Sequence, residues 1–231
     1  MTAERLELGQ EQYLPNEDKL VEQIAQISER LIHKNEQNVA QREQHPKQFG
    51  CLWAEFTIEP NLPETLRVGL FKDTKTYSAW VRVSSLRQQD DRKGDAHGLA
   101  IKLMDVPGEK VLEAEKQATT HDLLFTDHPV FLIRNLSDYV EFFKAGEEAH
   151  GKPPFKFLFP SLNPFKWRWT EAKILLVDLG LIKALTKISS PLAIQYWSMT
   201  PYKLGDQAIK FFIKPAAQNQ TPLPKTFTKD Y

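Results

Sequence analysis

The spacing of apolar residues changes near residue 50 from a helical period to a strand period, and this change constrains the fold more than any other feature of the chain. In the first part, apolar residues recur at intervals of three and four, as on one face of a helix. Neither Gly nor Pro occurs from 17 to 45, so the sequence predicts a helix from Asp18, capped by Asn16 or by Asp18 itself. The residues that carry the period are Leu20, Ile24, Ile27 and Leu31.

After residue 50 the pattern alternates, which is typical of half-buried strands. In the second predicted strand, for example, Arg82 shares a face with Trp80 and Ser84. Gly205 and Asp206 form a Gly-Asp pair between two late strands and predict a tight hairpin. The predicted strands are Cys51–Ile58, Tyr77–Ser84, 99–104, Asp122–Arg134 with an interruption near 127–129, Ile194–Leu204 and Gln207–Lys214.

Two further helices are expected between the strand groups, at Ser137–Ala149 and Trp169–Ile188. The segment between them, 153–169, reads PPFKFLFPSLNPFKWRW and predicts an irregular, aromatic loop. The order of elements gives an α+β fold that is mainly β, a meandering antiparallel sheet or barrel with helices at one end.

Composition narrows the class of function. The chain has 30 basic and 30 acidic side chains, and this balance argues against a nucleic-acid partner. One cysteine, Cys51, excludes an internal disulfide, and its place on the first strand predicts a small core residue. No histidine pair has metal-ligand spacing, and no nucleophile-elbow or P-loop motif occurs. The polar N-terminus and the lack of a long apolar run predict a soluble, cytoplasmic protein.

Four ordered segments carry a more specific signal. They read REQHPKQFGCLWAEF (42–56), WVRVSSL (80–86), KGDAHGLAIKL (93–103) and DLLFTDHPVFLIRN (122–135). In this order and spacing they resemble the catalase family of haem proteins, including its small peroxidase and allene oxide synthase relatives. The resemblance is specific from 42 to 143 and weaker from 194 to 215. It implies that 1–231 is a single domain with a catalase-like antiparallel β-barrel and helices, which binds haem b and acts on hydrogen peroxide or organic (fatty-acid) hydroperoxides.

The resemblance implies a role for several residues. His45 matches the distal histidine, which moves a proton between the two peroxide oxygens. Ser84 matches the serine that orients this imidazole and fixes its tautomer. Arg42 and Arg82 match arginines that hold the haem propionates, for which guanidinium groups are suited.

The distal amide of the family is replaced. Its two asparagines fall on Thr126, a weaker hydrogen-bond donor, and on Asp127, which could act only if the loop shifts by one residue. Phe131 matches an aromatic residue that lines the haem pocket, and Tyr139 takes the place of a phenylalanine stacked on the porphyrin. These departures favour slow peroxidase action or hydroperoxide rearrangement over fast peroxide disproportionation.

The family's iron ligand, a tyrosine in an R-x-x-x-Y helix, is not found after residue 170, so no metal ligand is identified. Tyr202 and Tyr231 lack that context, and the last two barrel strands would lie beyond Tyr231. The barrel is therefore expected to stay open, without its C-terminal strands and proximal helix. Either the chain is part of a longer or split gene product that supplies the missing C-terminal segment, or it is a degenerate relative that has lost haem. A homo-oligomer is a further alternative for the partner.

Three hypotheses about the function stay open at this point. The first is the haem-dependent peroxide enzyme; the second is a haem-free module that binds a lipid or a partner; the third is an unrelated β-barrel carrier of ligands. The aromatic loop 153–169 interleaves Lys, Arg, Trp and Phe and suits contact with a membrane surface, with packing against the barrel or a subunit contact as the alternatives.

Overall fold

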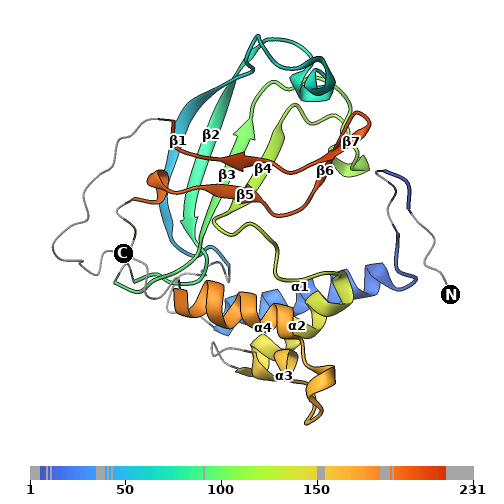
Figure 1. Cartoon of the computed structure of the whole chain (residues 1–231), viewed down its shortest axis with the longest axis vertical. Coiled ribbons are helices and arrows are strands. Elements are labelled where there is room, and N and C mark those ends of the chain that lie inside the picture. The colour runs from blue at the N-terminus through green and yellow to red at the C-terminus, as the bar shows by residue number, and fades with distance from the viewer. Residues whose placement is uncertain are drawn as a thin grey trace.

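A computed structural model describes residues 6–8, 10, 12–34, 40, 42, 44–90, 92–149, 154–182, 188 and 190–216. Six strands form one antiparallel sheet in the order β1-β2-β3-β4-β5-β8, and β6 and β7 form a separate hairpin (Figure 1). The sheet curls without closing in this order, since β1 and β8 are its two ends. The strands are β1 (Gln48–Thr57), β2 (Thr76–Ser85), β3 (His97–Leu103), β4 (His121–Thr126), β5 (Tyr196–Ser198), β6 (Tyr202–Leu204), β7 (Gln207–Ile209) and β8 (Phe212–Ile213).

The first four strands confirm the alternating pattern of the sequence. Ser84 pairs with Gly98, and Gly98 with Thr126, so these residues form one row across β2, β3 and β4. Because successive residues of a strand point to opposite faces, Arg82 and Ser84 share the face opposite to Val83. The expected α+β, mainly β architecture, an open antiparallel barrel with helices, is confirmed.

The late strands are shorter than expected, and one expected extension is wrong. β4 ends at Thr126, and the segment to Arg134 is not a strand. Asp127 donates its backbone N–H to the carbonyl of His97 at 3.0 Å, and Pro129 then has no N–H with which to continue the ladder. In the C-terminal region Pro201 separates β5 from β6, while the Gly205 turn (φ 57°) confirms the predicted hairpin.

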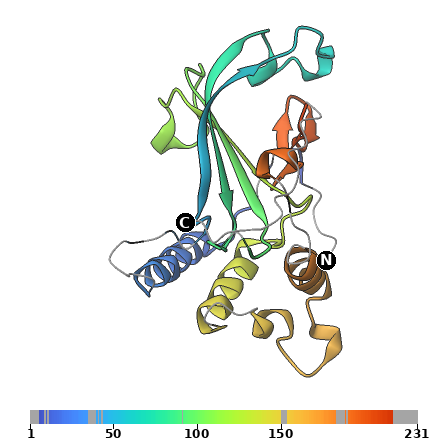
Figure 2. The ribbon, with the colours of Figure 1, turned by 90° about the vertical axis from the view of Figure 1, so that its left-hand side faces the viewer.

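The helices gather at one end of the sheet, as Figure 2 shows in profile. The predicted helices are present: α1 packs on α2, where Arg30 binds Glu147 at 2.9 Å. The helix expected at Trp169–Ile188 is present up to 182, with 183–187 outside the described residues. No helix in the described part of the chain is long and apolar enough to cross a membrane. The helices are α1 (Glu17–Lys34), α2 (Leu136–Ala149), α3 (Phe155–Leu158) and α4 (Trp169–Ala172), which continues as a π-helical stretch, Lys173–Ile182.

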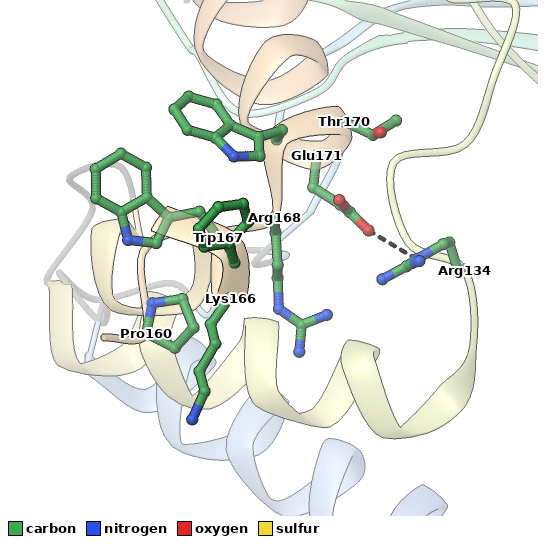
Figure 3. A pocket seen from close by; sticks show the side chains of 9 residues that line it. Arg134, Pro160, Lys166, Trp167, Arg168, Thr170 and Glu171 are labelled. Atoms are coloured by element: carbon green, nitrogen blue, oxygen red, sulfur yellow. Dashed lines mark ion pairs between the residues drawn. The ribbon is translucent and has the colours of Figure 1, made fainter. Parts of the chain in front are cut away.

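The segment 154–169, called the aromatic loop from here on, is irregular as predicted; residue 153 lies outside the described residues. It contains the single-turn helix α3 and a 3₁₀ turn, Pro164–Lys166. Asn163 caps this turn by accepting the backbone N–H of Phe165 at 3.0 Å. The loop lies at the far end of the helical layer from the sheet (Figures 1 and 2), and Figure 3 shows its junction with α4.

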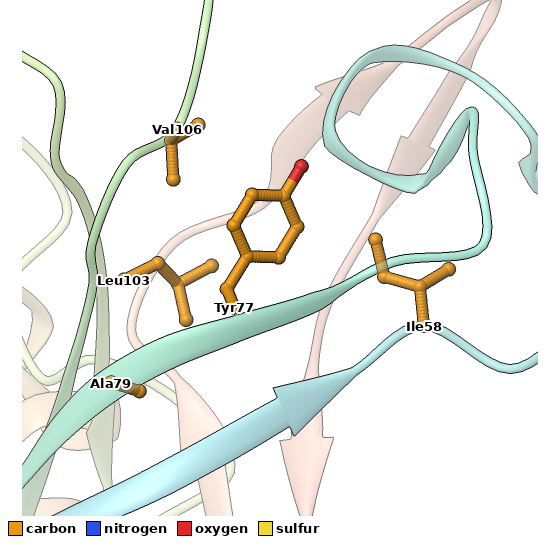
Figure 4. Packing of buried hydrophobic residues seen from close by; sticks show 5 residues of the cluster. All are labelled: Ile58, Tyr77, Ala79, Leu103 and Val106. Atoms are coloured by element: carbon orange, nitrogen blue, oxygen red, sulfur yellow. The ribbon is translucent and has the colours of Figure 1, made fainter.

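The sheet's inner face carries an apolar core. One cluster brings together β1, β2, β3 and the segment after β3, and Leu103 within it has no exposed surface (Figure 4). A second cluster includes Val83, Leu99, Phe125 and Tyr196. Burial of these side chains is the main stabilisation of the curled sheet and holds β2–β4 in fixed register.

Candidate functional site

His45 stands just before β1 in a backbone conformation that few non-glycine residues adopt, with φ 53°. Its N–H donates to the carbonyl of Leu86 at 3.0 Å, and its own carbonyl accepts from Arg82 Nη2 at 3.1 Å. These two bonds hold the left-handed conformation and fix the direction in which the imidazole leaves the chain.

The imidazole of His45 lies directly over Gly98 of β3. His45 Nδ1 and Ser84 Oγ are 3.0 Å apart and form a hydrogen bond, and Ser84 is buried. A Cβ on Gly98 would come within 2.4 Å of His45 Cε1 and 2.7 Å of Nδ1. Only glycine leaves room for the ring here, so the strand register and the missing side chain together position the imidazole.

The surroundings of His45 favour its neutral form. Burial lowers the pKa of the imidazole, and the charges of Arg82 and Arg42 lower it further. A hydrogen bond with the backbone of Ser85 and the charge of Asp95 act in the opposite direction. A neutral imidazole can accept a proton at neutral pH, which a histidinium cannot.

Arg42 and Arg82 come close enough to repel each other beside this histidine. Burial and then Arg42 lower the pKa of Arg82. Arg82 hydrogen-bonds Gln48 Oε1 at 3.1 Å and the His45 carbonyl, both neutral groups, and among the described residues neither arginine has an ion pair with a carboxylate. Two cations near the imidazole, with no acidic partner among the described residues, favour an anionic ligand.

Thr126 and Asp127, the two expected distal residues, lie on opposite faces of the sheet. Thr126 is in the row of Ser84 and Gly98 and therefore on the face of the imidazole. Asp127 belongs to the other face by alternation, where it is buried and its Oδ2 lies 3.1 Å from Nδ1 of His97. Burial of the Tyr196 phenol, and then the charge of Asp127, raise the pKa of Tyr196, because both disfavour the phenolate.

Phe131 and Tyr139 lie in the helical layer. Their rings are 6.1 Å apart, and Tyr139 on α2 also packs edge-on against Phe143 at 4.8 Å. Phe131 is 38 % exposed. Their expected contacts with a porphyrin remain predictions.

Asp95 is a positioning residue that the sequence did not single out. Its Oδ2 accepts the backbone N–H groups of Leu86, Arg87 and Gln88 at 2.9, 2.7 and 2.8 Å. The carbonyl of Leu86 is the one that binds the His45 N–H. The signal was present, since Asp95 and Gly98 both lie in KGDAHGLAIKL (93–103), one of the four segments that carry the resemblance.

The outer sheet face on the side of His45 carries exposed apolar side chains among polar ones, such as the Lys102–Asp122 ion pair next to Trp80. Trp53 and Trp80 pair directly across β1 and β2, with ring centroids 4.9 Å apart in an edge-on arrangement, and are 58 % and 43 % exposed. Leu124 lies two strands away on the same face, also exposed. Cys51 is exposed there too, so its assignment to the core is wrong: it lies opposite Arg82 on this outer face.

These residues fit the distal half of a haem site. A porphyrin needs an apolar surface, cationic partners for two propionates and a neutral distal base, and the face of β1–β4 offers all three. No cluster of three or more His, Cys, Asp and Glu side chains that could hold a metal ion occurs in the part of the chain that the structure describes.

Comparison with known proteins gives one kind of match. No protein-family model and no curated protein matches the sequence. Among solved structures, a fungal catalase matches with 17% identity over 90% of this chain (TM-score 0.47), and catalase A of Saccharomyces cerevisiae with 16% identity over 87% (TM-score 0.43). A bacterial catalase matches with 22% identity over 63% (TM-score 0.35).

The chain covers 39%, 38% and 25% of these three catalases, in the order fungal, yeast, bacterial. The structure is thus similar to catalases, as the sequence motifs implied, and it spans less than half of their length.

Proposed function

We propose that this chain forms the distal half of a haem-dependent peroxide site, which acts on hydrogen peroxide or on an organic hydroperoxide such as that of a fatty acid. The observation that carries the proposal is the arrangement of His45, a neutral imidazole held over Gly98 by Ser84, near two arginines that have no acidic partner among the described residues.

Arg42 and Arg82 would hold the propionates of haem b, and the Trp53–Trp80 face would contact the porphyrin. Haem, when bound, supplies the redox chemistry that cleaves the O–O bond. A ligand for the haem iron would be supplied by a C-terminal segment or by a second chain.

His45 performs the proton transfer. With Nδ1 engaged by Ser84, Nε2 accepts the proton from the peroxide O–H and returns it to the other oxygen, so no strong base is left behind. Ser84 keeps the ring in one orientation and one tautomer. The hydroxyl of Thr126, on the same face, donates one hydrogen bond to the peroxide.

The test is peroxide consumption by the purified chain with added hemin and 4-methylphenol, which stands in for the tyrosine ligand of the family. We expect His45→Ala to lower the rate by about 10²-fold or more, since general acid–base groups contribute at least this much. His121→Ala is the matched control, because His121 is half-buried at the opposite end of the β3–β4 pair. Equal rates in His45→Ala and wild type would refute the assignment, and running the assay with hydrogen peroxide and with linoleic acid hydroperoxide identifies the substrate class.

A second candidate is a haem-free module that binds a partner through the sheet edges. It is favoured by the outermost place of β1, a ten-residue strand with one neighbour, β2, in the described chain. Amide hydrogen exchange separates the two candidates. If the chain is a haem-free module, a partner protects the β1 amides that do not face β2, and added hemin changes no exchange rate.

A further inference from the structure

The tip of the aromatic loop exposes large apolar side chains to an unusual degree. Leu162 is 99% exposed and Phe165 is 97% exposed, and Trp169 and Phe155 are more than half exposed. A single exposed apolar residue needs no explanation, but a cluster of four within one loop marks an interaction surface.

Internal hydrogen bonds hold the shape of this tip. Trp167 Nε1 donates to the carbonyl of Ser161 at 2.7 Å, and Trp169 Nε1 donates to that of Pro164 at 3.2 Å. Both indole N–H groups are therefore satisfied inside the loop, and both rings can enter an apolar environment at little cost.

The loop is fastened to the helical layer at its base. Arg168 forms ion pairs with Asp138 at 2.8 Å and Glu141 at 2.6 Å, and its guanidinium stacks on Phe157 at 4.4 Å. Its backbone N–H donates to the carbonyl of Leu158 at 2.9 Å. The exposed tip is thus presented by a fixed base, as an inserting element requires.

The aromatic loop is rich in basic side chains, although Arg168 is paired with two carboxylates of α2 and Lys156 is paired with Glu148 at 2.6 Å. Residues 154–173 contain four basic side chains and one acidic one, and the acidic one, Glu171, is buried and paired with Arg134 at 2.8 Å (Figure 3). Lys166 adjoins Phe165, is exposed, and has no ion pair within the described residues. An open depression of about 420 Å³ beside it is lined by Lys166, Arg134 and Arg168.

We propose that the aromatic loop docks the chain on an anionic lipid surface, with Leu162 and Phe165 inserted among the lipid headgroups and Lys166 in contact with their phosphates. Aromatic and aliphatic side chains flanked by lysine are the composition of interfacial anchors. A second copy of this chain fits less well, since a two-fold contact through the tip would bring the two Lys166 side chains together. The inference does not depend on haem binding.

Cosedimentation with sucrose-loaded vesicles tests the proposal, using phosphatidylcholine alone and phosphatidylcholine mixed with phosphatidylserine. We expect the wild-type chain to bind the mixed vesicles. The double variant Leu162→Ser, Phe165→Ser should bind them about tenfold or more weakly, because both apolar insertions are lost. Lys166→Glu should weaken vesicle binding by a similar factor. The effect of this substitution should grow with the fraction of phosphatidylserine and shrink at high salt.

The matched control replaces another exposed apolar pair, Val111 and Leu112, which are 101% and 64% exposed in the segment between β3 and β4. The Val111→Ser, Leu112→Ser variant should bind as the wild type does. No binding to mixed vesicles, or equal loss in both double variants, would overturn the proposal. Sedimentation velocity without lipid tests the alternative of a second copy. A wild-type dimer together with a monomeric Leu162→Ser, Phe165→Ser variant would overturn the proposal in favour of that alternative.

Discussion

Gly98→Ala is the substitution whose effect the site geometry defines most sharply. The new methyl group would lie 2.4 Å from His45 Cε1 and 3.2 Å from Ser84 Oγ. Carbon atoms in contact keep about 3.5 Å, so the imidazole must retreat by about 1 Å, which breaks its 3.0 Å bond to Ser84. A displacement of this size at a reacting group costs about 10²-fold in rate. Overpacking should also lower the free energy of unfolding by about 1–2 kcal/mol.

Two readouts check this prediction. The ¹H and ¹³C resonances of His45 Cε1–H report the move of the ring without any cofactor, and urea denaturation reports the loss of stability. Gly50→Ala is the matched control, because a Cβ at Gly50 of β1 meets no atom within 4 Å. We expect it to leave the His45 signal unchanged and to alter stability by less than about 1 kcal/mol.

A Gly98→Ala variant with the wild-type His45 resonance and wild-type stability would refute the reasoning, because the ring could not then lie over the glycine.

Three further predictions concern the same group of residues. Ser84→Ala should lower peroxide turnover about 10- to 100-fold, as loss of an orienting partner does, and leave hemin affinity unchanged; an unchanged rate would exclude the orienting role. Arg82→Gln removes a charge that lowers the pKa of His45, so we expect that pKa to rise and the acid limb of activity to move to higher pH, measured by NMR titration of His45; a downward shift would contradict this sign. Asp95→Ala leaves three backbone N–H groups without their acceptor and should destabilise the fold by about 2 kcal/mol in urea denaturation, whereas an unaffected midpoint would show that water replaces the carboxylate.

The sequence predicted the first four strands and the late hairpin because these elements depend on local periodicity and local turn residues. The alternation around Trp80, Arg82 and Ser84 placed all three on one face, which the pairing of β2 with β1 and β3 confirms. The Gly205 turn was predictable for the same reason, since its chemistry is local.

The parts that failed depend on contacts between distant segments. Apolar residues continue past Thr126, yet β4 ends there, opposite Gly98 near the start of β3, and Pro129 has no N–H with which to extend the pairing. Cys51 was assigned to the core, although alternation alone cannot say which face of an open sheet is covered.

For the candidate site, the sequence named residues but could not give their arrangement. The motifs pointed to His45, Ser84 and Arg82, and the structure brings these three together. That His45 adopts a positive φ, or that Gly98 supports its ring, requires the register of three strands and could not be read from spacing.

The most direct test of the central claim, that the face around His45 and Arg82 takes haem, is a visible absorption titration of the purified chain with hemin and with hemin dimethyl ester. If Arg42 and Arg82 hold the propionates, hemin should give a sharpened Soret band and bind about tenfold or more tightly than the ester, a difference that Arg82→Gln removes. Free-hemin spectra throughout, or equal affinity for the two porphyrins, would contradict the account.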